Sequence, residues 1–214
     1  MPVHHEDRNG LKLAVYYEHP KWFAPLFDEL DLRGVAFDRQ LAFEHQFDPA
    51  VRVSPYSLVV NRMSPSAYTR DHAQAIPYTL HYLAYLKEIN ANVINGYEAY
   101  VYEFSKARQL SLLERLGLRY PRARVINHPT QAPAAAQDLA FPVIVKPNIG
   151  GSGAHIVRYD TPEVLRAAVD AGSVDLGIDD TGLVQEYLTA EENSIVRVEI
   201  LGGEYLYAIR LFLA

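Results

Sequence analysis

A lysine followed closely by a cluster of glycines is the feature of this sequence with the clearest chemistry. Lys146 ends the apolar run 141–146, and a second β-type run covers residues 154–158. The cluster between the two runs consists of Gly150, Gly151, Ser152 and Gly153. Glycines let a backbone adopt positive φ angles and approach a ligand, and successive exposed N–H groups form an anion-binding turn. With the Ser152 hydroxyl as a further donor and the lysine charge at its base, the pattern favours a β–loop–β lid over phosphates.

Two better-known phosphate motifs do not fit this segment. A Walker A loop requires Gly-Lys-Ser/Thr after its first glycines and then a helix, whereas a β-type run follows here. A Rossmann fingerprint requires G-x-G-x-x-G spacing and again a following helix. On composition alone, a glycine-rich hairpin turn beside an exposed lysine remains the alternative.

The elements before this motif alternate between strand and helix. Short apolar runs predict strands at 11–17, 34–37, 56–60 and 92–95. Apolar residues at helical spacing predict helices at 23–32, 76–86 and 97–116, the last ended by Gly117 and Pro121. Strand, helix and strand at this pace predict α/β layering with parallel strands.

The second half of the chain is richer in β-type runs. Strands are expected at 122–126, 141–146, 154–158 and 183–188, and helices at 133–139 and 161–171. Thr161 followed by Pro162 is a typical helix start. Two further apolar runs, 194–201 and 204–213, are joined by Gly202-Gly203 and predict a hairpin.

Four ordered motifs run from about Asn92 to the C-terminal end of the sequence. They are Asn95-Gly96 with Glu103–Lys106, then Pro142–Pro147 with its glycine loop, then Val184–Leu188, and last Arg197-Val198 with Gly202-Gly203 and Arg210. Their order and spacing resemble the ATP-grasp superfamily, most closely its RimK-like and glutathione-synthetase-like branch. The resemblance implies an α/β fold of the α+β ATP-grasp type. Its expected units are a Rossmann-like N-terminal domain (1–104), the small lobe with its glycine-rich lid (105–190) and the first strands of a truncated large lobe (191–214).

The resemblance also implies roles for the matching residues. Lys106 and Lys146 would contact the ATP phosphates from two different elements, beneath a lid formed by Gly150–Gly153. The interlobe hinge would consist of Gln185, Glu186, Tyr187 and Leu188. In it, the C=O of Glu186 would accept a hydrogen bond from the adenine amino group and the N–H of Leu188 would donate to the ring. Without the resemblance, Lys106 reads as a solvated helix lysine and the hinge as a plain edge strand.

Two further roles are less well matched. RimK-like members carry an aspartate two residues before the arginine of the last motif, used on the ribose, but this sequence has Ile195 there. Glu191 is the favoured substitute, with Glu192 and Asn193 as alternatives. Arg210 resembles a catalytic arginine near the reacting phosphoryl group, where a fixed cation offsets developing charge. A strand arginine facing water is the equal alternative.

The activity implied by the resemblance is an ATP-dependent ligation of a carboxylate to an amine, with an amino acid or peptide as substrate. ATP would phosphorylate the carboxylate, and the amine would attack the acylphosphate. Mg²⁺ would bridge the phosphates, but its Asp, Glu and Asn ligands are expected beyond residue 214, so no metal ligand is expected in the chain and the fragment should be inactive. The alternative is a non-catalytic, ATP-binding regulatory module of the same fold.

Composition limits the partners. With 20 Lys+Arg against 26 Asp+Glu, the formal net charge is −6, and an acidic chain has no electrostatic reason to bind nucleic acid or an anionic membrane. Cysteine is absent, which excludes disulfides and a cysteine nucleophile. The polar start lacks a signal-peptide pattern and no apolar run could span a membrane, so a cytoplasmic protein is expected. Asn61-Arg62, at the end of an expected strand, is a candidate substrate site, with a plain loop as the alternative.

The last residues of the sequence form an apolar β-type run without a polar tail. We interpret this as a sign of a fragment of a longer protein. Such a fragment should expose apolar strand surface at residues 194–214 and associate through it, as a homo-oligomer or an aggregate.

Overall fold

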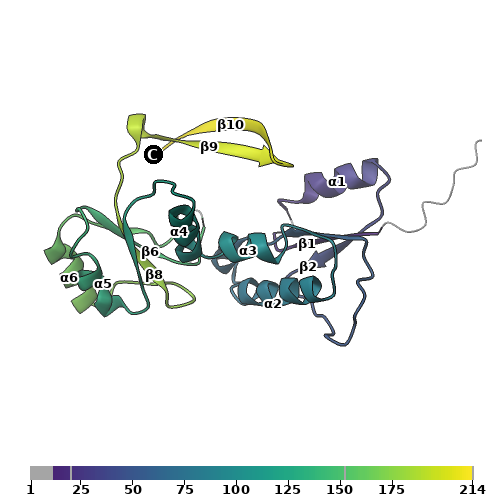
Figure 1. Cartoon of the computed structure of the whole chain (residues 1–214), viewed down its shortest axis with the longest axis horizontal. Coiled ribbons are helices and arrows are strands. Elements are labelled where there is room, and N and C mark those ends of the chain that lie inside the picture. The colour runs from purple at the N-terminus through teal and green to yellow at the C-terminus, as the bar shows by residue number, and fades with distance from the viewer. Residues whose placement is uncertain (1–11, 20, 152, 214) are drawn as a thin grey trace, which may run out of the picture.

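Three separate sheets organise the chain. The computed structural model describes residues 12–19, 21–151 and 153–213. Figure 1 shows an elongated molecule with one sheet at each end and a long hairpin lying across the helices between them. The expected division at residues 104 and 190 separates these sheets from one another and stays a proposal.

The first sheet is parallel and has helices on both faces. Its strands stand in the order β2-β1-β3-β4 and cover Leu13–Tyr17 (β1), Phe37–Leu41 (β2), Leu58–Arg62 (β3) and Val93–Ile94 (β4). Helix α1 (Ala24–Leu32) lies on one face, and α2 (Ala75–Glu88) on the other (Figure 1). Alternate residues of β1 enter the two cores, Ala14 and Tyr16 on one side and Val15 and Tyr17 on the other. This explains why β1 reads as a continuous apolar run.

Two elements in this half differ from the sequence prediction for clear physical reasons. The strand expected at 34–37 begins only at Phe37, because Gly34 ends the preceding turn with a φ of +63°. The single helix expected at 97–116 is two helices, α3 (Tyr97–Glu103) and α4 (Lys106–Arg115). Ser105 separates them, because its side chain accepts a hydrogen bond from the N–H of Arg108 and caps α4. The break places Lys106 at the first position of a new helix.

The second sheet is antiparallel, with strands in the order β5-β8-β6-β7. The strands are β5 (Ala123–Ile126), β6 (Val143–Pro147), β7 (Val157–Tyr159) and β8 (Gly182–Glu186). Strand β6 pairs with β7 through Val143 and Tyr159, which confirms the predicted strand–loop–strand unit, although β7 begins later than expected. The apolar face is covered by α5 (Ala132–Ala135) and α6 (Pro162–Asp170), the latter capped by Thr161 as predicted.

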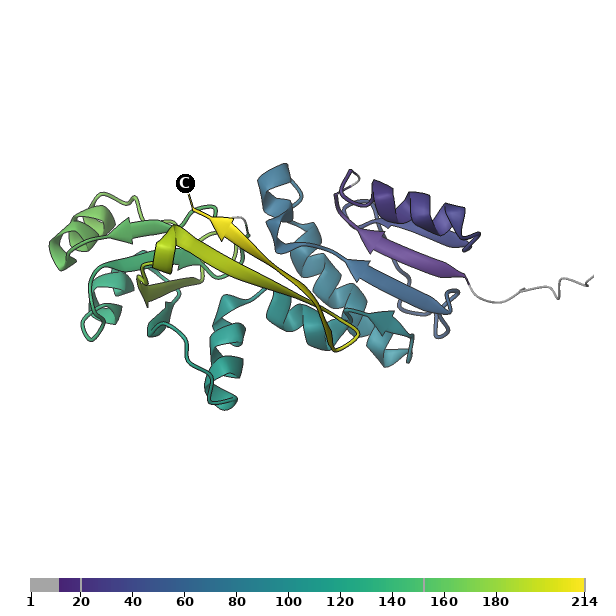
Figure 2. The ribbon, with the colours of Figure 1, turned by 90° about the horizontal axis from the view of Figure 1, so that it is seen from above.

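The third sheet is the predicted hairpin, formed by β9 (Ser194–Leu201) and β10 (Glu204–Phe212). Gly202 and Gly203 both have positive φ and make its turn. Figure 2 shows the hairpin running from the second sheet toward the first. Across the ranges that the structure describes, no helix is long and apolar enough to cross a membrane.

Candidate functional site

Two lysines from different elements meet in one small cavity. Lys106 begins α4 and Lys146 lies in β6, and both line a cavity of about 30 Å³ that the glycine loop covers. The Lys106 ammonium donates to the C=O groups of Asn148 and Gly150, each at 3.1 Å. Burial and the charge of Lys146 together lower the pKa of Lys106 to about 8, and burial lowers the pKa of Lys146. Two crowded cations of this kind favour an anionic ligand.

Asn148 holds the two lysine-bearing elements together. Its side-chain carbonyl accepts from the Ser105 hydroxyl at 3.1 Å and from the N–H of Ala107 at 2.9 Å. Its amide group donates to Asp179 at 2.8 Å. The side chain is 5% exposed, and every one of these bonds is long-range in sequence. Sequence reasoning missed this residue, because a single asparagine after Lys146-Pro147 belongs to no spacing pattern.

The glycine loop packs closely against the N-terminal domain. A Cβ at Gly151 would lie 3.1 Å from the Cβ of Ser66, which belongs to the 3₁₀ helix η1 (Pro65–Arg70). Gly153 has a φ of +72°, a conformation that other residues rarely adopt. Glycine at position 151 therefore allows the close approach to Ser66, and glycine at position 153 allows the positive φ. Ser152, the predicted hydroxyl donor, lies outside the described residues.

The predicted hinge, Gln185 to Leu188, begins with the last two residues of β8, which pair with β6, and continues for two residues beyond the strand. Glu186 is opposite Val143, and Leu183 is opposite Lys146, so about 10 Å separates hinge and lysine at roughly 3.3 Å per residue. The N–H of Tyr187 donates to the C=O of Pro142 at 2.9 Å. Among the described residues, the N–H of Leu188 has no hydrogen-bond partner.

Side chains of the hinge region point in different directions. Gln185 is buried, with 8% of its surface exposed, whereas Leu188 is 63% exposed. The Glu186 carboxylate accepts from the N–H of Ala140 at 2.9 Å and lies 3.5 Å from the Arg122 guanidinium. The Glu186 side chain is therefore engaged with neighbouring segments, and its N–H donates to the C=O of Arg122 at 3.0 Å, so that its backbone C=O remains for a ligand.

Arg210 is paired within the hairpin region. Its guanidinium donates to Glu192 at 2.6 Å and does not line the lysine cavity. The Asn193 amide donates to the C=O of Leu213 at 2.7 Å. Of the three predicted ribose candidates, Glu191 alone has a side chain without a bonded partner in the described part of the chain. The ribose role of Glu191 and the catalytic role of Arg210 stay predictions.

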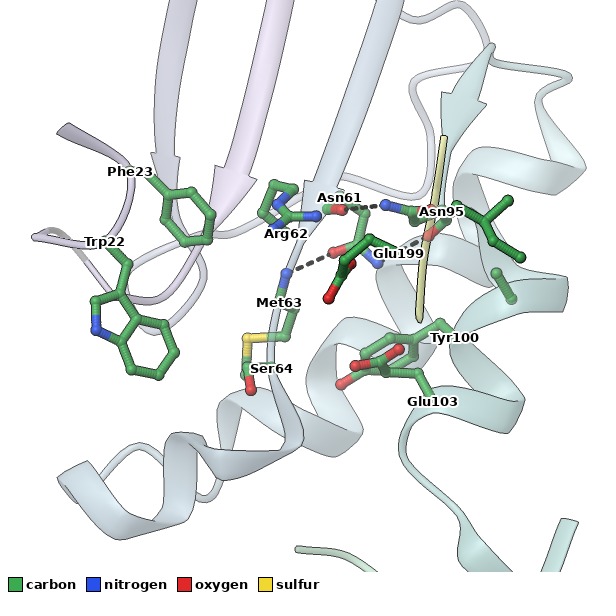
Figure 3. A pocket seen from close by; sticks show the side chains of 12 residues that line it. Trp22, Phe23, Asn61, Arg62, Met63, Ser64, Asn95, Tyr100, Glu103 and Glu199 are labelled. Atoms are coloured by element: carbon green, nitrogen blue, oxygen red, sulfur yellow. Dashed lines mark hydrogen bonds between the residues drawn. The ribbon is translucent and has the colours of Figure 1, made fainter. Parts of the chain in front are cut away.

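A larger pocket of about 510 Å³ opens at the carboxyl ends of the parallel strands (Figure 3). Asn61 and Arg62, the predicted substrate candidates, both line it. The Asn61 amide donates to the C=O of Asn95 at 2.9 Å, and its oxygen accepts from the N–H of Met63 at 3.0 Å. The sequence reasoning did not assign further polar and aromatic groups to this pocket. They come from the turn before α1, from α3 and from β9: Trp22, Tyr100, Glu103 and Glu199.

The sequence is similar to that of known ATP-grasp proteins. The model of the RimK-like ATP-grasp domain matches residues 104–212, and the chain belongs to that family. The D-alanine–D-alanine ligase of Ectopseudomonas mendocina (strain ymp) is 32% identical over 118 residues, which cover 55% of this chain and 36% of the ligase. The chain thus matches about a third of the length of that relative.

Solved structures share the fold at low sequence identity. A RimK domain ATP-grasp protein from Sphaerobacter thermophilus DSM 20745 has a TM-score of 0.64 at 16% identity, covering 87% of this chain and 68% of that one. The D-cycloserine synthetase DcsG has a TM-score of 0.64 at 20% identity, covering 92% and 66%. The predicted α/β fold of the ATP-grasp type is confirmed by these similarities and by the sheets described above.

Proposed function

We propose that this chain binds ATP and belongs to a ligase that joins a carboxylate to an amine through an acylphosphate. The γ-phosphoryl group of ATP passes to a carboxylate oxygen and ADP leaves. The amine nitrogen then attacks the acyl carbon and phosphate leaves. In this scheme Lys106 and Lys146 offset the charge on the transferred phosphoryl group.

One observation carries the proposal. Two lysines with lowered pKa values lie under a glycine loop, and an extended hinge strand runs beside one of them, Lys146, in the same sheet. An elongated anion with a planar base at its far end suits this layout, with the base against Gln185–Leu188 and the phosphates at the lysines. Because the cavity at the lysines is only about 30 Å³, the loop must lift to admit phosphates.

The residues fit a nucleotide better than they fit a metal ion. In the described ranges, no group of three or more His, Cys, Asp or Glu side chains could hold a metal. We assign no Mg²⁺ ligand among the described residues and no step to Mg²⁺. The expectation of ligands beyond residue 214 stays a prediction, as does the cytoplasmic location.

The residues that line the larger pocket support a proposal for the class of substrate. Arg62 can pair with a carboxylate, while Glu103 and Glu199 can pair with an ammonium group. Trp22 and Phe23 add an aromatic wall, and Arg62 lies over the Phe23 ring at 5.3 Å. A molecule with both charges, such as an amino acid or a short peptide, suits this set. Nucleic acid does not, because the chain is acidic.

A trapping experiment tests the proposal. A form of the protein that extends beyond residue 214, where the Mg²⁺ ligands are expected, is incubated with ATP, Mg²⁺, single amino acids and hydroxylamine. Hydroxylamine replaces the amine substrate and converts an acylphosphate into a hydroxamate. Hydroxamate and ADP should form together, and only when ATP and a carboxylate are both present. ATP binding without either product would instead favour the regulatory module, and absence of ATP binding would refute both.

A further inference from the structure

The 3₁₀ helix η1 of the N-terminal domain presents a tyrosine to the glycine loop. The Tyr68 hydroxyl is buried and has no hydrogen-bond partner among the described residues. A buried hydroxyl without a partner loses the hydrogen bonds that water would give it, so such groups are uncommon and call for an explanation. The surroundings of this hydroxyl supply one.

Tyr68 and Lys106 approach the same point of the glycine loop. An ideal Cβ on Gly150 would lie 3.4 Å from the Tyr68 hydroxyl oxygen and 3.5 Å from the Lys106 nitrogen. The Tyr68 ring also lies 5.9 Å, centroid to centroid, from that of His155, at the far end of the loop. The hydroxyl and the ammonium group that we assign to the phosphates therefore both lie within 3.5 Å of one point on the loop.

A buried ion pair fixes the element that carries Tyr68. Glu18 follows β1, is 1% exposed, and accepts from Arg70 at 3.0 Å and from His72 at 2.6 Å. Burial raises the pKa of Glu18, but the hydrogen bonds from Arg70 and His72 outweigh this and leave it below its ordinary value. The carboxylate therefore stays charged and ties η1 to the end of the parallel sheet.

We propose that the Tyr68 hydroxyl, from the N-terminal domain, donates a hydrogen bond to the phosphate that Lys106 and Lys146 bind. A phenolic O–H forms a strong hydrogen bond to an ionised oxygen, and a phosphate would satisfy the donor left unpaired in the protein. This inference rests on the proposed nucleotide site. It makes nucleotide binding depend on the position of the N-terminal domain.

The substitution Tyr68→Phe tests the inference, because it removes the hydroxyl and keeps the ring. Titrations with ADP and with adenosine should show ADP affinity reduced about five- to tenfold and adenosine affinity unchanged. The thermal midpoint without nucleotide should be unchanged or higher, since an unpaired hydroxyl is lost. Tyr85→Phe is the matched control: its hydroxyl donates to the C=O of Val51 at 2.8 Å, away from the loop, and ADP affinity should not change.

The outcomes separate this inference from the proposed function. If Lys146→Ala weakens ADP binding and Tyr68→Phe does not, the phosphate site stands and the role of Tyr68 is refuted. An equal loss of ADP and adenosine affinity, or a lower thermal midpoint, would show that the hydroxyl acts within the protein and would also refute it. If neither substitution affects ADP binding, the proposed phosphate site itself is wrong.

Discussion

At the scale of single residues, the charges of Lys106 and Lys146 dominate the site. Each is partly withdrawn from water, and their mutual repulsion contributes to the lowered pKa of Lys106. A bound phosphate would neutralise both and remove this repulsion. The two lysines should therefore affect nucleotide affinity more strongly than any exposed lysine of the chain.

Replacing Lys146 by alanine should weaken ATP binding about tenfold or more, equivalent to about 1.4 kcal/mol. Lys146→Arg should restore only part of the affinity, because the planar guanidinium is larger and directs its donors differently. Isothermal titration with ATP measures both effects. Lys87→Ala is the control, since Lys87 is exposed and pairs with Glu98. Equal affinity in Lys146→Ala and the unaltered protein would contradict the assignment.

The protonation of Lys106 should make ATP binding pH-dependent. Its pKa of about 8 means that the positive charge is lost as the pH rises through 8, so ATP affinity should fall between about pH 7.5 and 9.5. In that range the phosphates are already ionised and add no change of their own. Lys106→Arg keeps its charge at every one of these pH values and should flatten the profile. If the ATP affinity of Lys106→Arg falls with pH as steeply as that of the unaltered protein, Lys106 is not the source of the pH dependence.

The same shift has a consequence for stability. The folded protein binds the Lys106 proton more weakly than the unfolded chain, whose lysine has the ordinary pKa of 10.5. The unfolded state thus holds more protons between these two values, and the contribution of Lys106 to the free energy of unfolding should rise from about pH 8 toward 10.5. Urea denaturation of the unaltered protein and Lys106→Met, compared across this range, would measure it.

At the scale of elements, the contact between the glycine loop and η1 is the feature to test. Gly151→Ala places a methyl group 3.1 Å from the Cβ of Ser66, so either the loop or η1 must move. We expect the displaced loop to weaken ATP binding about three- to tenfold, as determined by titration. Gly153→Ala should also weaken binding, but through its positive φ, because among the described residues, chain neighbours aside, no atom lies within 4 Å of the added methyl.

The two glycine substitutions differ in how they can be rescued. Ser66→Gly removes the atom that Gly151→Ala would meet, so the double variant should regain most of the lost affinity. The same change should not rescue Gly153→Ala. Additive losses in the Ser66→Gly, Gly151→Ala pair would mean that the loop does not close against η1.

At the scale of the whole molecule, the hairpin of β9 and β10 stands apart from the two cores. Val196, Val198 and Ile200 lie on one face of β9, with exposed fractions of 60%, 53% and 66%. On β10, Tyr205 and Phe212 are 68% and 75% exposed. A two-stranded sheet with this much exposed apolar surface is marginal alone and offers an open edge to another strand.

We therefore predict that the chain of 214 residues associates through residues 194–214. The double variant Val196→Thr, Val198→Thr keeps β-branched side chains but lowers the apolar area, and it should shift the protein toward the monomer in sedimentation velocity runs. Leu32→Thr, which removes an isolated side chain that is 81% exposed, is the control and should leave association unchanged. A monodisperse monomer of the unaltered chain would show the prediction to be wrong.

The pairing of β6 with β7 and the Thr161 cap could be predicted because their causes are local. Residues close in sequence produce them, through side-chain alternation, a turn or a capping hydroxyl. The prediction of a single helix at 97–116 was wrong, and the reason is partly a long-range contact. Its apolar spacing continues through Phe104, but Ser105 donates to Asn148, 43 residues away, and that contact helps to fix the break.

The sequence alone determined the family and the strand–glycine loop–strand unit that carries Lys146, because these residues lie within one short segment whose backbone conformation is local. Only the tertiary structure decided which groups surround that loop. Lys106 reaches it through Asn148, and Ser66 and Tyr68 reach it from the 3₁₀ helix η1. Such neighbours depend on how separate elements pack, and neither residue type nor spacing reports the distance between segments far apart in the chain.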